Sequence, residues 1–147
     1  MSDLLSSIAS VQRGPDAEQE GRTVLNLKPK ILQEMEKFGL GHPKSSELAI
    51  IFANMCNAAA KQLLGFEGRK LRIAKKLLDI AQHVLRLDSS YLLFMDNRKT
   101  LALTYNNRGC LLQKQSRYQV AINSLHTDNQ QMIFSSLRMH TTALSRP

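Results

Sequence analysis

The chain has 147 residues, of which 43% are hydrophobic and 22% charged, and its net charge is +8. This length suffices for a buried core without disulfides or metal, and the scarcity of aromatic residues predicts a core of Leu, Ile, Ala and Met, which favours helices over sheets. Neither a membrane-spanning apolar run nor a secretion signal is evident, and the two cysteines form no CxxC pair, which argues against a disulfide scaffold.

Residues 1–28 are predicted to be a mobile tail. They are rich in Ser, Gln, Glu, Asp and Gly, contain Pro15, and show no apolar periodicity long enough to bury one face. A short first helix is expected to begin at Pro29, since proline suits the first helical position, and to end before Gly39. The apolar residues on one side of this helix are Ile31, Met35 and Phe38.

Two longer helices are expected next. Ser45 or Ser46 is a suitable N-cap for a helix that continues through Leu64, and Gly65 and Gly68 bracket the following turn. The third helix is predicted from Arg69 to about Leu87. Its buried face is indicated by apolar residues that recur every three or four positions, namely Leu71, Ala74, Leu78, Ala81 and Leu85.

The segment DSSYLLFMDN is expected to connect to a fourth helix, from about Arg98 to Gln115, and Ser116 is a suitable cap for a fifth through Leu125. No stretch alternates polar and apolar residues with a period of two, so the fold class is predicted to be all-α. Gly109, inside the fourth helix, costs roughly 1 kcal/mol relative to alanine, which indicates a packing role.

An internal repeat suggests what that role is. LAIIFANMCNAAAKQ, from Leu48, and LALTYNNRGCLLQKQ, from Leu101, share Leu-Ala, an aromatic residue, an asparagine, a small residue and a final Lys-Gln. An amphipathic segment follows each, so we expect two antiparallel helical hairpins, residues 45–87 and 97–127. Two backbones would then touch where Gly109 faces Ala121, and Gly109→Leu is predicted to cost several kcal/mol by overpacking.

The second hairpin resembles the tetratricopeptide repeat. The matching residues are Ala102, Tyr105, Asn107, Gly109, Leu112, Tyr118, Ala121 and Leu125. Arg108 replaces the usual leucine, and Asp128 stands where the family has alanine, while the first hairpin matches only across an insertion. The resemblance implies that residues 29–147 form a short solenoid of stacked hairpins, with residues 129–147 covering the last one. Alternatively, the uncovered end self-associates, or the chain is part of a longer array.

The function implied by the resemblance is a non-enzymatic adaptor that binds a peptide or helix of a partner protein in a groove lined by the first helices of its hairpins. Asn54 and Asn107 occupy the position that often faces this groove, and an amide suits a peptide main chain. Lys61, Arg108 and Lys114 would make the groove cationic. Alternatively, the asparagines bond a neighbouring turn or face water, and the lysines are solvated charges near helix ends.

The charge distribution supports a second interpretation. Residues 1–60 carry six Lys and Arg against seven Asp and Glu, whereas residues 61–147 carry 14 against five. This excess favours an acidic partner. Arg69, Arg72 and Lys76 fall on one helical face, so the alternative function is a basic helical protein associated with nucleic acid, although no aromatic platform accompanies these charges.

Other chemistry is not expected from the sequence. GLGHPKSS is not a phosphate-binding loop, because Pro43 replaces a required glycine and no strand precedes it. The four histidines show no metal-binding spacing, and no carboxylate or nucleophile stands in a catalytic context, so we expect no metal, cofactor or enzymatic activity. Cys56 and Cys110 are predicted to be reduced core residues, which favours a cytoplasmic location.

Overall fold

The computed structural model describes residues 3, 4, 6, 8, 16–87 and 95–145, with side chains described for all of these except 95, 96 and 127–145. In this part of the chain every regular element is a helix, which confirms the predicted all-α class. The chain divides into two units, Met1–Leu111 and Leu112–Pro147. The boundary falls inside the segment for which the sequence predicts the second hairpin.

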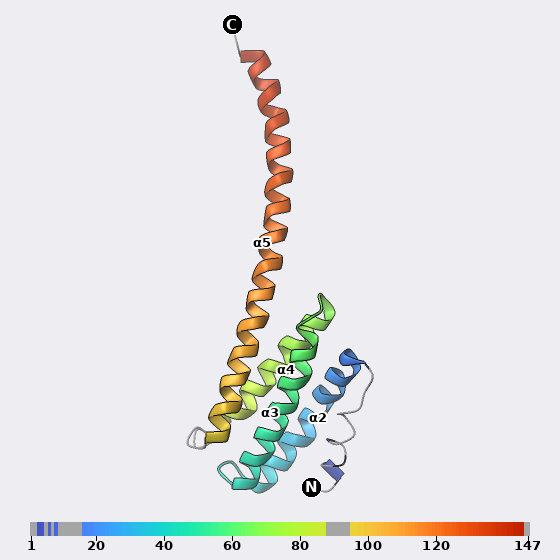
Figure 1. The fold of residues 1–147 in the computed structure, drawn as a ribbon, viewed down its shortest axis with the longest axis vertical. Helices are drawn as coiled ribbons and strands as arrows, with labels where there is room; N and C mark the ends of the chain where they lie inside the picture. The colour runs from blue at the N-terminus through green and yellow to red at the C-terminus, as the bar shows by residue number, and fades with distance from the viewer. Residues whose placement is uncertain (1–2, 5, 7, 9–15, 88–94, 146–147) are drawn as a thin grey trace. The chain divides into compact units, whose positions relative to one another are not determined.

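The first unit is an up-and-down bundle. Its helices are α2 (Ala17–Phe38), α3 (Pro43–Leu63), α4 (Arg69–Arg86) and the beginning of α5 (Met95–Ser145). The first three pack against one another in every pairing, and successive helices run in opposite directions (Figure 1). Hydrogen bonds to α3 and α4 hold the first part of α5.

The core of the bundle is centred on α3, which is buried over most of its circumference. Phe52 is its largest fully buried side chain, and small residues such as Ala53 and Ala60 allow neighbouring helices to approach. The face predicted for α4 is confirmed, because Leu71, Ala74, Leu78, Ala81 and Leu85 are all at most 5% exposed. Burying each such leucine contributes about 1.5–3 kcal/mol, so this interface is an important part of the hydrophobic core of the first unit.

Helix α2 begins at Ala17, so the prediction of a mobile tail is wrong for residues 17–28. Asp16 caps the helix by accepting a hydrogen bond from the Glu18 N–H at 3.0 Å. Val24 and Leu27 are buried before Pro29, which lies inside the helix although it lacks the N–H that a helical hydrogen bond needs. Tertiary packing therefore outweighs the weak local helix signal. Residues 9–15 of the predicted tail lie outside the described residues, whereas Leu4 and Ile8 are helical and buried.

The first turn of α3 also differs from the prediction. Its N-cap is His42, whose Nδ1 accepts from the Lys44 N–H at 3.1 Å. Ser45, a predicted cap, is instead buried within the helix, with its Oγ 2.9 Å from the carbonyl oxygens of both Met35 and Gly39. The hydroxyl therefore serves the end of α2 rather than the beginning of α3. The predicted span of α4 is confirmed to within one residue.

The predicted crossing of Gly109 and Ala121 is wrong. Both residues lie on α5, which runs unbroken from Met95 to Ser145 and contains Ser116, the predicted cap, in its interior. A Cβ atom at position 109 would meet nothing within 4 Å. Residues 97–127 therefore form no antiparallel hairpin. The segment predicted to cover such a hairpin, residues 129–147, continues α5 to Ser145, and its side chains lie outside the described residues.

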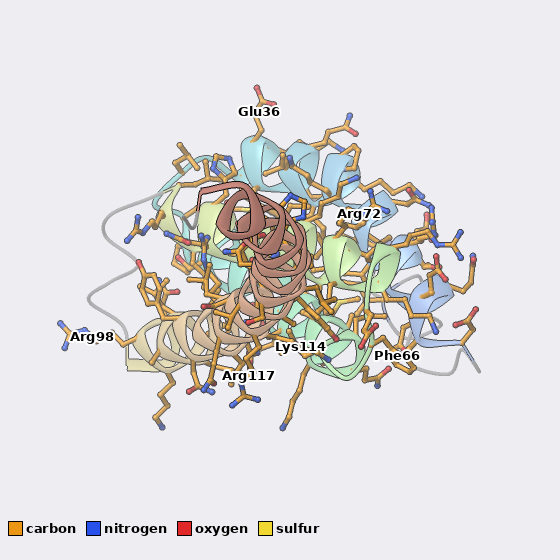
Figure 2. All side chains as sticks on the ribbon, turned by 90° about the horizontal axis from the view of Figure 1, so that it is seen from above. Glu36, Phe66, Arg72, Arg98, Lys114 and Arg117 are labelled. Atoms are coloured by element: carbon orange, nitrogen blue, oxygen red, sulfur yellow. The ribbon has the colours of Figure 1, made fainter. Side chains whose placement is uncertain are left out.

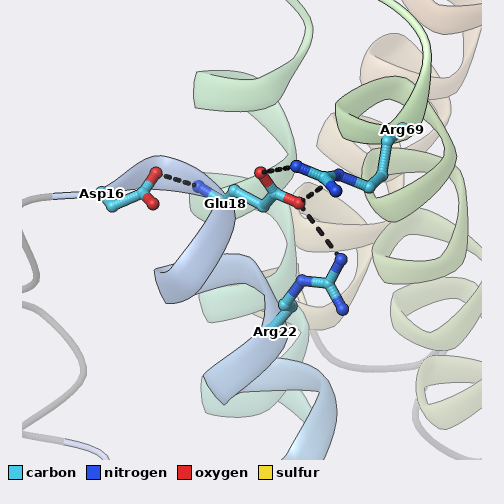
Figure 3. Close-up of polar contacts among 4 residues, drawn as sticks. All are labelled: Asp16, Glu18, Arg22 and Arg69. Carbon is cyan, nitrogen blue, oxygen red and sulfur yellow. Dashed lines mark hydrogen bonds and ion pairs between the residues drawn. The ribbon is translucent and has the colours of Figure 1, made fainter.

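An ion cluster at the surface of the bundle ties α2 to α4. Exposed side chains such as Glu36 point away from the bundle (Figure 2). Glu18, by contrast, is only 12% exposed, and its Oε1 lies 3.1 Å from Arg22 Nη2 and 2.7 Å from Arg69 Nε (Figure 3). The hydrogen bond from Arg22 and the charge of Arg69 hold the pKa of the Glu18 carboxyl below its ordinary value, although desolvation acts in the opposite direction. Glu18 also places a negative charge near the beginning of α4, whose first turn contains no acidic residue.

Candidate partner-binding surface

A ladder of polar side chains joins α3 to the first part of α5. Asn57 Nδ2 donates to the Ala53 carbonyl at 2.9 Å and to Thr104 Oγ1 at 2.8 Å, while Asn57 Oδ1 accepts from Asn107 Nδ2 at 3.0 Å. Thr100 Oγ1 donates to Asn54 Oδ1 at 3.3 Å. Such hydrogen bonds specify how two helices align but add little hydrophobic stabilisation.

The buried face of α5 is also mainly polar. The buried side chains between residues 97 and 126 are Asn97, Thr100, Thr104, Asn107 and Leu111. Since only the last of these is apolar, α5 is held on the bundle by polar contacts more than by hydrophobic burial.

The two asparagines predicted to face a groove belong to this ladder. Asn107 is 4% exposed and donates to Asn57, so it has no surface left for a partner, and we withdraw it from the predicted binding residues. Asn54 remains exposed while accepting the hydrogen bond from Thr100. The recurrence of asparagine in the two sequence segments thus corresponds to contacts between α3 and α5.

Arg108 is also engaged within the first unit. Its Nη1 lies 3.1 Å from Asp79 Oδ1 and donates to Gln82 on α4. Arg86 of α4 makes a similar cross-helix contact by donating to the hydroxyl of Tyr105. The predicted role of Arg108 in a cationic groove is therefore replaced by a structural contact between α4 and α5.

The predicted lysines belong to different units. Lys61 is exposed in the last turn of α3, where a cation interacts favourably with the helix dipole. Lys114 is half-buried on α5 in the second unit.

The second unit is a single helix whose side chains are exposed or half-buried from residue 112 to residue 126. No side chain between residues 112 and 126 is buried, and four large aliphatic residues are more than half exposed: Leu112 59%, Val120 61%, Ile122 57% and Leu125 66%. Tyr118 is half-buried. A helix without tertiary packing is only marginally stable in water. This segment also lacks the Glu–Lys pairs that support isolated helices, because residues 98–127 contain no Asp or Glu.

One face of this helix carries an apolar seam, defined here as Tyr118, Ile122 and Leu125. Spacings of four and three residues place these side chains above one another on a helix. Figure 2 shows Lys114 and Arg117 projecting from the same side of α5. The four-and-three spacing was the sequence signal for this surface, but the sequence analysis used Tyr118 and Leu125 only as residues that match the tetratricopeptide repeat.

The cysteines and the other potential ligands add no further site. Cys56 is buried, and this burial raises the pKa of its thiol, whereas Cys110 is exposed, which corrects its prediction as a core residue. Among the described residues, no three His, Cys, Asp or Glu side chains gather where they would hold a metal ion. Within the same residues, no helix combines the length and the apolar character needed to cross a membrane.

Comparisons with known proteins found no matching family model, curated protein or solved structure. The resemblance to the tetratricopeptide repeat therefore stays a prediction from the residues alone.

Proposed function

We propose that the protein is a non-enzymatic interaction module that binds a helical segment of another protein along α5 between residues 112 and 126. The observation that carries this proposal is the exposure of Ile122 and Leu125, at 57% and 66%, on a helix with no buried side chain in that stretch. A partner helix would cover the apolar seam and supply the packing that the isolated helix lacks.

This proposal keeps the adaptor function expected from the sequence but moves the binding surface. The bundle of the first unit acts as the folded base from which α5 continues. The partner contacts the seam rather than a groove between hairpins, because Asn107 and Arg108 are already engaged by Asn57 and Asp79.

The test is affinity capture from an extract of the cells that make the protein, with two matched double variants. Ile122→Ser with Leu125→Ser removes the seam, while Leu112→Ser with Val120→Ser removes two equally exposed apolar residues outside it. A partner that binds wild type and the second variant but not the first supports the proposal. Equal capture by all three proteins contradicts it, provided that circular dichroism shows each of them folded.

A second candidate function, association with nucleic acid, is favoured by one observation on α4. Arg72 and Lys76 are exposed, and neither makes an ion pair within the part of the chain that the structure describes. Arg69, the third residue of the predicted basic stripe, is held by Glu18 at 2.7 Å. Fluorescence anisotropy with labelled DNA and RNA tests this function. Binding that falls steeply with salt and is lost in an Arg72→Glu, Lys76→Glu variant supports it.

A further inference from the structure

We infer that the partner segment is an acidic amphipathic helix, whose apolar side chains cover the seam and whose carboxylates face Lys114 and Arg117. This inference rests on the proposed function and adds the chemistry of the partner to it.

The first argument is the charge of the helix that forms the surface. Between Arg98 and Thr127 the chain contains five Lys and Arg and no Asp or Glu. Two of these cations, Lys114 and Arg117, stand four residues and one residue before Tyr118, the first member of the seam. Lys114 therefore stands one turn before the seam on the same face, and Arg117 lies beside the seam. Charged residues at the border of an apolar seam select the partner in paired helices.

The second argument is the geometry of helix pairing. A helix that packs on the seam places its own apolar residues against Tyr118, Ile122 and Leu125, and the positions beside them come opposite the flanking cations. Carboxylates at those positions complement the charge and orient the partner, whereas cations there repel it. Acidic residues are therefore the required chemistry at the rim of the contact.

The same charges argue against a second copy of this chain paired in parallel. That pairing would bring Lys114 and Arg117 near the same cations of the other copy, with no carboxylate on either helix between residues 98 and 127 to compensate.

The distribution of apolar side chains argues against a membrane surface. Leu112 and Val120 lie away from the seam around the helix, so the exposed apolar residues do not gather on the single wide face that an interfacial helix needs. A phosphate backbone could bind the cations but would leave the apolar side chains of Ile122 and Leu125 uncovered, which favours a partner helix over nucleic acid at this surface.

The experiment uses the full-length protein and two synthetic helical peptides, each about three heptads long, with leucine at every a and d position. One peptide has glutamate at every e and g position, and the control has lysine there. Fluorescence anisotropy is expected to show that the glutamate peptide binds at least about tenfold more tightly than the lysine peptide at low salt, and that high salt narrows this difference.

Variants with reversed charges on α5 test the inference more strictly than the two peptides alone. Lys114→Glu with Arg117→Glu is expected to exchange the preference, so that the lysine peptide becomes the tighter ligand. Arg72→Glu with Lys76→Glu makes the same change of charge on α4 and is expected to leave both affinities within about twofold of wild type. The Ile122→Ser, Leu125→Ser variant is expected to lose both peptides, with affinities reduced on the order of a hundredfold.

The inference is overturned if the two peptides bind equally, or if charge reversal on α5 and on α4 have the same effect. It is also overturned if wild type alone forms a dimer through the seam in sedimentation, or binds anionic vesicles or labelled DNA more tightly than the glutamate peptide. If the peptide experiment fails but cellular capture still depends on Ile122 and Leu125, the inference of an acidic partner is wrong and the proposed function is retained. Capture that is insensitive to those two residues contradicts the function itself.

Discussion

Gly21 of α2 lies directly against Leu63 of α3, since a Cβ atom at position 21 would stand 3.0 Å from Leu63 Cδ1 and 3.1 Å from Ile73 Cγ2. This glycine, rather than Gly109, marks the close approach of helices in the bundle. We expect Gly21→Leu to destabilise the protein by about 1–3 kcal/mol through overpacking, measured by urea unfolding. Gly21→Ala should change stability less, because flexible methyl ends can move and alanine favours the helix by about 1 kcal/mol.

The matched control is Gly109→Leu, which introduces the same side chain where nothing lies within 4 Å of the new Cβ. It should leave stability unchanged or raise it slightly, because leucine is a better helix former than glycine. A loss of stability as large as that of Gly21→Leu would indicate that Gly109 lies against another helix, as the sequence predicted.

Asn57 is the central member of the polar ladder, and its truncation should be costly. Asn57→Ala leaves Thr104 and Asn107 without the partner they have at 2.8 and 3.0 Å, in a buried site. We expect a loss of about 1–3 kcal/mol in the free energy of unfolding. Asn54→Ala, at an exposed position of the same interface, should cost less than half as much. Equal losses in the two variants would show that burial of the ladder has no energetic consequence.

Glu18 should give the stability a dependence on pH. Its pKa is lower in the folded protein than in the unfolded chain, so its contribution is present above the unfolded-state pKa and is lost as the pH falls through the folded-state pKa. Wild type is therefore expected to be more stable than Glu18→Gln near about pH 7, and the difference should disappear near about pH 2.

The control for this measurement is Glu20→Gln, which changes the same helical turn but not the ion pair with Arg69. This variant reports only the effect of removing a negative charge from the first turn of α2. A pH dependence identical in the Glu18 and Glu20 variants would mean that the contact with Arg69 contributes nothing.

The two cysteines should differ in reactivity. Cys110 is exposed, whereas Cys56 is buried and its thiol has a raised pKa, which disfavours the reactive thiolate. Native protein treated with iodoacetamide is expected to be alkylated rapidly at Cys110, and at Cys56 only in denaturant, as followed by peptide mass spectrometry. Comparable rates at both positions in the native protein would contradict the burial of Cys56.

Features of the fold that depend on local pattern could be predicted from the residues alone. The three- and four-residue recurrence of Leu71, Ala74 and Leu78 was sufficient to place the buried face of α4, because one helical turn after another repeats the same geometry. Gly39 marked the C-terminal end of α2 and Gly68 marked the beginning of α4. The backbone has positive φ at both glycines.

Contacts between residues far apart in the chain could not be predicted and became known from the folded structure. Residues 17–28 contain Gly21 and precede Pro29, so they show a weak helix signal until packing against Leu63 and Ile73 compensates for it. The internal repeat identified Asn54 and Asn107 but not their partners, Thr100 and Asn57. A small residue such as Gly109 is equally compatible with a close crossing and with an open helix surface, because the absence of a side chain permits contact without providing any attraction.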